Sequence, residues 1–147
     1  MESLSSQNTT MKKTLRIGFA LGMSVICGAL IAQTEADVST AMKEVAATNG
    51  KLKGAVAAKD APGSTAAAKV LENDFKQVAA YFTAKSIPDG ADKAKAAMTA
   101  AANVQKAVAA GNFDEATTQA AAVGSACGPC HMAHRGQKGA DGTYPIH

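Results

Sequence analysis

The chain has 147 residues, which is room for one domain of ordinary size. It contains no Trp, two Tyr and four Phe, so few large aromatic side chains are available to fill a core. Its formal net charge is +3, and no cluster of Lys and Arg is long enough to indicate nucleic-acid binding.

Alanine is abundant in the sequence. It is the best helix former and has almost no side chain to pack. An Ala-rich, aromatic-poor chain therefore favours long helices that approach one another closely but fill a core poorly. A large buried cofactor would supply the missing apolar volume, and the composition is compatible with one.

Residues 11–33 have the order of a secretory signal peptide. A short basic run is followed by an apolar segment, residues 17–32, that ends in small residues. This segment is about 16 residues long, shorter than the ~20 that a membrane-spanning helix needs, so cleavage is favoured over a retained anchor. We expect residues 1–33 to be a signal peptide, translated from Met1 or Met11, and the mature chain to be periplasmic without stable membrane insertion.

Two details of the predicted signal peptide stay open. Ala29, Ala32 and Gln33 are each imperfect ends for a cleavage site. Cys27 suggests a lipoprotein site, but residues 24–26 are a poor match to the small residues that usually precede one.

Cleavage changes both the charge and the cysteine content. It removes three of the 15 basic residues and one of the 12 acidic ones, which leaves a net charge of +1. A nearly neutral domain is suited to weak, transient encounters with partner proteins rather than to electrostatic capture. Cleavage also removes Cys27, so the mature chain keeps Cys127 and Cys130. Free thiols rarely persist in an oxidising compartment, so we expect these two in a disulfide, on a metal or modified.

Apolar side chains that recur every three or four residues predict the first two helices. The first covers about residues 35–53, and the second runs from a cap at Ser64 or Thr65 to about Lys85. Between them, residues 61–63 (Ala-Pro-Gly) indicate a turn. The inward positions of the two helices are predicted to be Val38, Met42, Val45, Asn49, Leu52, Leu71, Phe75, Val78 and Phe82.

Two further helices follow the chain break at residues 86–90. The third is expected from about residue 91 to 110, and the fourth begins at Phe113 or Asp114 after a short Gly-Asn turn. Their predicted inward positions are Ala94, Met98, Ala101, Val104, Val108, Phe113, Ala116, Ala120, Val123, Cys127 and His131.

No strand pattern appears, so the expected fold class is all-α, an antiparallel four-helix bundle over residues 34–135. Residues 136–147 are rich in Gly and are expected to form an irregular, flexible C-terminal tail.

A Cys-x-x-Cys-His sequence, residues 127–131, closes the fourth predicted helix. Two thiols three positions apart can reach both vinyl groups of one porphyrin and form thioethers, and the next histidine is then held beneath the ring, where it binds iron. The motif predicts one covalent haem c at Cys127 and Cys130, with His131 as an iron ligand.

Three other chemistries use the same residues. Cys-Gly-Pro-Cys is also the active sequence of thioredoxin-like dithiols, but there the motif follows a strand, whereas a helical pattern precedes Cys127 here. Zinc is a second alternative, with His134 and His147 as further ligands, although the spacing matches no common zinc module. A structural disulfide is a third, but so short a loop gains little stability.

Pro129 predicts a local disturbance of the fourth helix. It has no N–H to donate to the carbonyl oxygen of Ser125, and its ring crowds that carbonyl. We expect a kink or a lost hydrogen bond near residues 125–129.

From about residue 100 to 135 the sequence AAANVQKAVAAGNFDEATTQAAAVGSACGPCHMAHR resembles the third helix, turn and haem-bearing fourth helix of the class II cytochromes c, which include cytochrome c prime. The stretch AMKEVAATNGKL is similar to the Met-Lys start of the first helix in that family. The resemblance implies a signal peptide, a four-helix bundle, thioethers at Cys127 and Cys130, and His131 as the proximal ligand. It also implies homodimers that form through the first two helices.

The resemblance assigns two further residues to the haem. Arg135 matches the arginine that closes the family's motif, and Met42 matches a position on the opposite side of the haem, where a methionine is the sixth ligand in low-spin members. Two departures weaken the expected polar contacts at the haem edge. His134 stands where Phe or Tyr is common, and Val38 stands where Arg is common.

Two functions follow from the choice at Met42. If Met42 binds iron, the protein carries single electrons between redox partner proteins. If Met42 stays off the metal, an apolar pocket formed by residues such as Val38, Leu71 or Phe75 would bind small gases (NO, CO). His134 lies one turn from His131 and is expected at the surface or against a haem propionate. No hydrolytic triad or carboxylate pair is present, so we do not expect an enzyme.

Overall fold

The computed structural model describes residues 33–140 and 142–147, and all of the following concerns these residues. The predicted signal peptide, except Gln33, lies outside them. The described chain forms five helices: α1 (Glu35–Ala57), α2 (Ala61–Ala84), α3 (Pro88–Ala109), α4 (Phe113–Ser125) and α5 (Cys127–His134). Among these residues there is no β-sheet, only one isolated bridge between Arg135 and Ile146.

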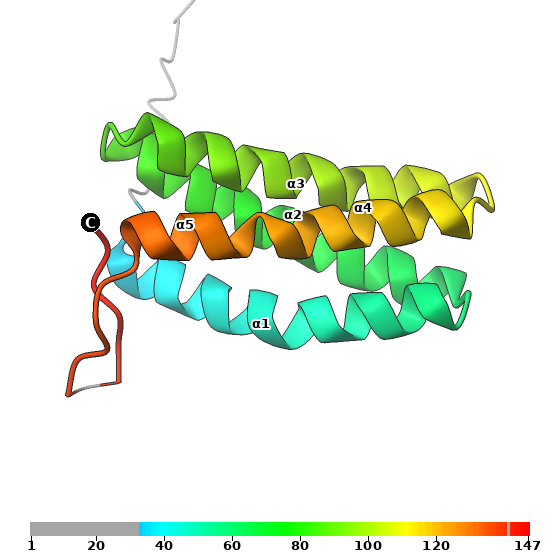
Figure 1. The fold of residues 1–147 in the computed structure, drawn as a ribbon, viewed down its shortest axis with the longest axis horizontal. Helices are drawn as coiled ribbons and strands as arrows, with labels where there is room; N and C mark the ends of the chain where they lie inside the picture. The colour runs from blue at the N-terminus through cyan, green and yellow to red at the C-terminus, as the bar shows by residue number, and fades with distance from the viewer. Residues whose placement is uncertain (1–32, 141) are drawn as a thin grey trace, which may run out of the picture. The chain divides into compact units, whose positions relative to one another are not determined.

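The helices form a closed bundle in which α1, α2, α3 and α4 run alternately in opposite directions (Figure 1). α1 packs against α2 and α4, and α3 packs against the same two helices. Helix α5 continues the line of α4 with a break between them. The prediction of an all-helical fold without strands is confirmed for the described part of the chain.

Short connections of three residues each join the long helices, at 58–60, 85–87 and 110–112. The middle residue of each connection is in the left-handed region, with φ of 55° at Lys59, 59° at Ser86 and 70° at Gly111. Only glycine adopts this conformation without steric cost, so the first two connections hold residues that carry some strain.

Two helices begin earlier than the sequence predicted. α2 begins at Ala61 and is capped by Asp60, whose Oδ1 accepts a hydrogen bond of 3.1 Å from the Gly63 N–H, so the predicted cap at Ser64 or Thr65 is wrong. α3 begins at Pro88 instead of Ala91. In both helices a proline stands in the first turn, where a missing N–H costs nothing because first-turn N–H groups have no carbonyl acceptor within the helix.

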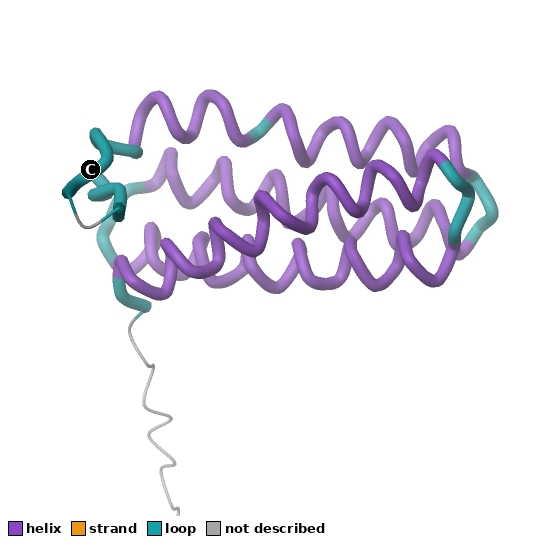
Figure 2. Tube along the Cα trace, turned by 90° about the horizontal axis from the view of Figure 1, so that it is seen from below, coloured by secondary structure: helices purple, strands orange, loops and turns teal. Residues whose placement is uncertain are grey.

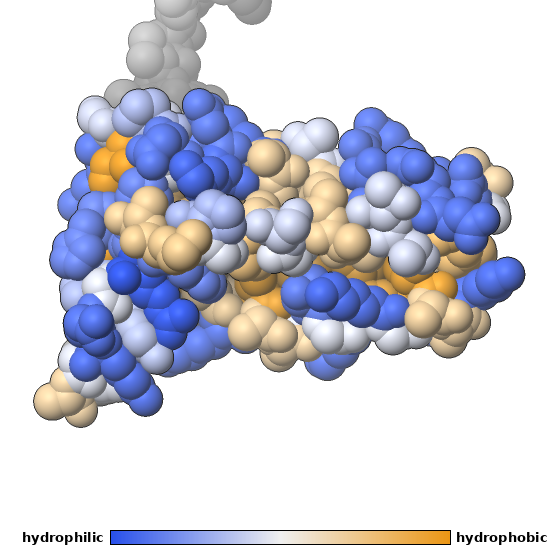
Figure 3. Space-filling model, viewed as in Figure 1, coloured by the Kyte–Doolittle hydropathy of each residue, from blue (hydrophilic) through white to orange (hydrophobic). Residues whose placement is uncertain are grey.

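The core follows the predicted stripes closely. Leu52, Leu71, Val104 and Val123 are fully buried, and the four apolar positions predicted along α2 are all buried. Met42, Met98 and Phe113 are only partly buried and pack against the core from its edges. On the face that carries α4 and α5, hydrophobic side chains are interspersed with hydrophilic ones (Figure 3).

Candidate functional site

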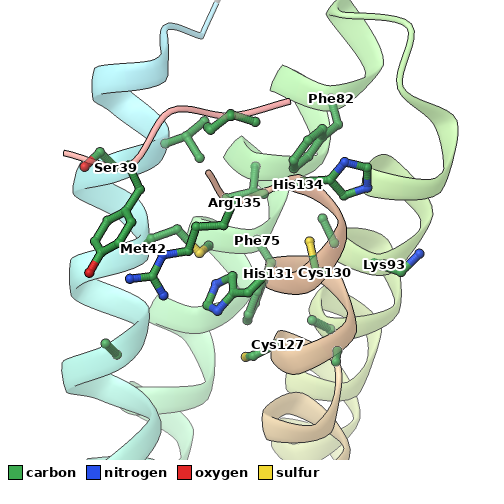
Figure 4. A pocket seen from close by; sticks show the side chains of 18 of the residues that line it. Ser39, Met42, Phe75, Phe82, Lys93, Cys127, Cys130, His131, His134 and Arg135 are labelled. Carbon is green, nitrogen blue, oxygen red and sulfur yellow. The ribbon is translucent and has the colours of Figure 1, made fainter. Parts of the chain in front are cut away.

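A cavity of about 280 Å³ lies between α1, α2, α3, α5 and the C-terminal residues. Helix α5 supplies both cysteines and His131, and the opposite walls are largely apolar (Figure 4). The residues that line the cavity are Val38, Ser39, Met42, Lys43, Ala46, Phe75, Val78, Phe82, Lys93, Ala94, Ala97, Ala126, Cys127, Cys130, His131, His134, Arg135, Gly142, Tyr144 and Ile146. All five residues that were predicted to hold a cofactor therefore line one cavity.

Pro129 breaks the helix that carries the motif, as predicted. Helix α4 ends at Ser125, Ala126 is a turn residue, and α5 starts at Cys127 (Figure 2). The Ala126 N–H still donates to the Ala122 carbonyl at 3.3 Å, but Pro129 has no N–H for Ser125. The break lies where the motif begins.

The two cysteines form no disulfide with each other, are half-buried and line the cavity. Cys127 Sγ lies 3.6 Å from the Val123 carbonyl oxygen, one turn earlier in α4. Burial raises the pKa of both thiols, and the charges of Lys53 at Cys127 and of Lys93 at Cys130 only partly oppose it. A dithiol that attacks disulfides needs a lowered thiol pKa, so this environment disfavours thioredoxin-like chemistry.

His131 projects into the same space as Met42. Its imidazole extends from α5, while the Met42 thioether reaches toward it from α1 (Figure 4). Burial lowers the pKa of His131, and the nearby charge of Arg135 lowers it further. The neutral imidazole that results is the form that binds a metal ion.

Arg135 lies at the mouth of the cavity, just after the end of α5. Its guanidinium carbon lies 3.5 Å from the centre of the Tyr144 ring, which is cation–π stacking. The side chain is exposed and contacts the Tyr144 ring, while the backbone of Arg135 pairs with that of Ile146.

His134 is buried, with 9% of its surface exposed, so the expectation of a surface position is wrong. Its Nε2 lies 2.8 Å from Asp89 Oδ2 of α3, and its Nδ1 lies 3.0 Å from the backbone oxygen of His147. Its ring also packs on Phe82, with centroids 5.1 Å apart. Sequence periodicity missed this position because the burial depends on α3 and on the C-terminal residues, which are distant along the chain.

A close contact between helices places Phe82 beside His134. Gly90 in the first turn of α3 packs so tightly on the Phe82 ring that a Cβ there would come within 2.6 Å of it. Asp89, next to Gly90, is thereby brought to His134. Partial burial alone would raise the pKa of Asp89, but the hydrogen bond and charge of His134, with Lys93 and the Gly90 N–H, outweigh it and lower that pKa.

The cavity has cationic side chains in its wall and no carboxylate. Lys43, Lys93 and Arg135 line it, and none of the described Asp or Glu residues does. An apolar cavity with two thiols and an imidazole on one wall, and cations in the lining, suits an apolar ligand that carries anionic groups. Haem, with its two propionates, has this chemistry, so the residues present fit haem c.

Several residues that line the cavity could not be assigned to it from the sequence. Ser39, Lys43 and Lys93 are polar positions on helices whose apolar stripes face the core, and only the neighbouring helices bring them to the cavity. Leu71, which was expected in a pocket for small gases, is fully buried in the core and does not line the cavity, whereas Val38 and Phe75 do.

Comparisons with protein-family models, with curated proteins and with solved structures returned no match for this chain. Across the residues that the structure describes, no group of three or more His, Cys, Asp and Glu side chains has the arrangement of a metal site. None of the described helices has the combination of length and apolar character that crossing a bilayer requires.

Proposed function

We propose that this chain is an exported monohaem c-type cytochrome, similar to the class II cytochromes c, that carries single electrons. The observation that carries the proposal is the convergence on one apolar cavity of both motif thiols, the His131 imidazole and the Met42 thioether. The distance of Met42 from the motif along the chain makes this convergence a property of the fold.

In this proposal, Cys127 and Cys130 would hold haem through two thioethers, and His131 would bind its iron through an imidazole nitrogen. Met42 would offer its thioether to the same iron from α1, on the opposite wall. Haem contributes an iron that changes its oxidation state by one electron, and a thioether ligand raises its reduction potential. Lys43 and Arg135 offer positive charge to the propionates from the cavity wall, whereas the Lys93 ammonium is paired with Asp89 at 3.6 Å.

The protein's own contribution to electron transfer is rigidity and exclusion of water. The walls come from four packed helices, and Val78 and Phe82 in these walls are nearly fully buried. A site that changes little on gaining or losing an electron needs such a fixed, apolar surrounding. We further propose that the exchange occurs in the periplasm with redox partner proteins, in accord with the signal peptide predicted from residues 1–33.

A second candidate function is the binding of small gases at an open iron site. It is favoured by the apolar wall beside Met42, where Val38, Phe75, Val78 and Phe82 line the cavity. Here Met42 would pack against the wall and leave one position on the metal free.

The first experiment is expression of the full chain in a host that is competent for cytochrome maturation. We expect covalent haem in the mass of the purified protein, and its loss in a variant that carries both Cys127→Ala and Cys130→Ala. Purified protein without covalent haem would contradict the proposal.

The spectrum of the same protein separates the two functions. A low-spin spectrum that carbon monoxide does not change supports electron transfer with Met42 on the iron. A high-spin spectrum that changes at once with carbon monoxide supports gas binding and excludes Met42 as a ligand.

A further inference from the structure

Residues 142–147, called the strap below, fold back against the haem-motif helix. They were expected to be part of a flexible tail, and they contain no helix or named strand. Yet Gly142, Tyr144 and Ile146 line the cavity beside Arg135 and His134. The cavity therefore has a wall that no helix supplies.

Backbone hydrogen bonds hold the strap along residues 134–139. The Gly136 N–H donates to the Pro145 carbonyl at 2.8 Å, and the His147 N–H donates to the His134 carbonyl at 3.0 Å. A turn closes the other end, where the Gly139 N–H donates to the Thr143 carbonyl at 2.8 Å. These hydrogen bonds pair backbone groups that belong to no helix or sheet. They explain how a Gly-rich segment keeps one position.

Side chains attach the strap to the bundle at three points. Tyr144 stacks under the Arg135 guanidinium, and Ile146 packs against the buried cluster that contains Val38 and Phe82. The His134 ring connects the strap to α3, because its two nitrogens lie within hydrogen-bond distance of the His147 backbone oxygen and of Asp89. The strap thus contacts His134 of α5 and a buried cluster whose members come from α1, α2 and α3.

We infer that Tyr144 and Ile146 are wall residues of the cofactor site and determine how far water and small solutes reach the motif residues. The inference rests on the proposed function for the identity of the cofactor, but the position of the strap is independent of it. Opening the strap exposes the cavity on the side of Arg135, while the four long helices stay as they are. For a haem in this cavity, greater exposure to water lowers the reduction potential, because burial favours the less charged reduced state.

The experiment compares the full chain, as purified, with a double variant, Tyr144→Ala with Ile146→Ala. Gln137→Ala is the matched control, since Gln137 is an exposed residue of the neighbouring stretch 134–139, along which the strap is held, and does not line the cavity. Hydrogen exchange by mass spectrometry reports whether the amides of Gly136 and His147 are protected. We expect protection in the unmodified chain and in Gln137→Ala, and its loss in the double variant.

The second measurement reports access to the cavity. If the protein carries haem, hydrogen peroxide should bleach it several-fold faster in the double variant, and the midpoint potential should shift downward. If it carries none, the proposed function fails, and iodoacetamide should alkylate Cys127 and Cys130 several-fold faster in the double variant. The alkylation measurement thus tests whether the strap limits access to the cavity even if no haem is bound.

Two results would overturn the inference. One is free exchange of the Gly136 and His147 amides in the unmodified chain, which means that the strap is not docked. The other is an unchanged rate of bleaching or alkylation in the double variant. Circular dichroism verifies that the helices are intact, and Tyr144→Ala alone replaces the double variant if they are not, because Tyr144 is 36% exposed and contributes little to the core.

Discussion

Asp74 carries a carboxyl group on the buried face of α2, and 4% of the surface of this residue is exposed. Its Oδ2 has no hydrogen-bond partner among the described residues. Burial raises the pKa of Asp74 to about 6, and the negative charge of Glu44 on α1 adds to the effect. In the unfolded chain the ordinary pKa of 3.8 applies, so the folded state holds this proton more strongly.

This difference predicts that Asp74→Asn stabilises the protein at neutral pH. The contribution of Asp74 is favourable below about pH 3.8 and is lost as the pH rises through about 6, because the buried group must then ionise. At pH 7.5 the free energy of unfolding of the variant should exceed that of the parent by roughly 2 kcal/mol. Urea denaturation at pH 7.5 and pH 4 measures this difference in the free energy of unfolding, and the difference should be smaller at pH 4. Asp92→Asn, at an exposed position on α3, should show no such gain.

Met42 is the residue on which the choice between the two functions depends. If its thioether binds iron, Met42→Ala should turn a low-spin spectrum into a high-spin one and allow carbon monoxide to bind. Met98→Ala is the matched control, since Met98 is a partly buried methionine outside the cavity. Absorption spectra of the reduced proteins distinguish them, and identical spectra for Met42→Ala and the parent would remove Met42 from the iron.

At the scale of the elements, the connections between helices determine where α2 and α3 start. Lys59 and Ser86 occupy left-handed positions equivalent to that of Gly111, where a side chain is unfavourable. Each stands at the turn where an antiparallel pair reverses direction. The bundle therefore holds strain at two of these three connections.

Lys59→Gly should relieve part of that strain and stabilise the protein by about 0.5–1 kcal/mol. The gain is limited, because glycine also adds entropy to the unfolded chain. The midpoint of thermal unfolding measures the change. Lys51→Gly, at an exposed position inside α1, should destabilise by about 1 kcal/mol, since glycine there costs helix propensity without relieving strain. Equal effects of the two substitutions would contradict this account of the connection.

At the scale of the whole molecule, the cavity connects cofactor binding to stability. A bundle rich in alanine leaves about 280 Å³ between four helices and the C-terminal residues. An unfilled cavity removes contacts from every side chain that lines it. The fold is therefore expected to gain stability when the cavity is filled.

The haem-free variant with both Cys127→Ala and Cys130→Ala should be less stable than the haem-containing protein by on the order of 5 kcal/mol. Guanidinium denaturation of the two forms measures the difference. Cys127→Ala alone, which keeps the Cys130 attachment site, should lie between them. Equal midpoints for haem-containing and haem-free protein would mean that the cavity is not the cofactor site.

The amino-acid sequence by itself determined the helices, their inward stripes and the break at Ala126, three residues before Pro129. These features depend on residues three or four apart, so local periodicity and the chemistry of proline suffice to predict them. The starts of α2 and α3 were misplaced because Pro62 and Pro88 begin a helix as readily as they end one.

Only the tertiary structure decided what surrounds the motif. Met42, Lys93 and Tyr144 belong to segments far apart along the chain, and their meeting at one cavity depends on how the helices pack. The burial of His134 depends in the same way on Asp89 and His147, which no periodicity connects to it. The motif by itself indicates the chemistry, whereas packing between distant segments decides which other side chains lie close to the motif.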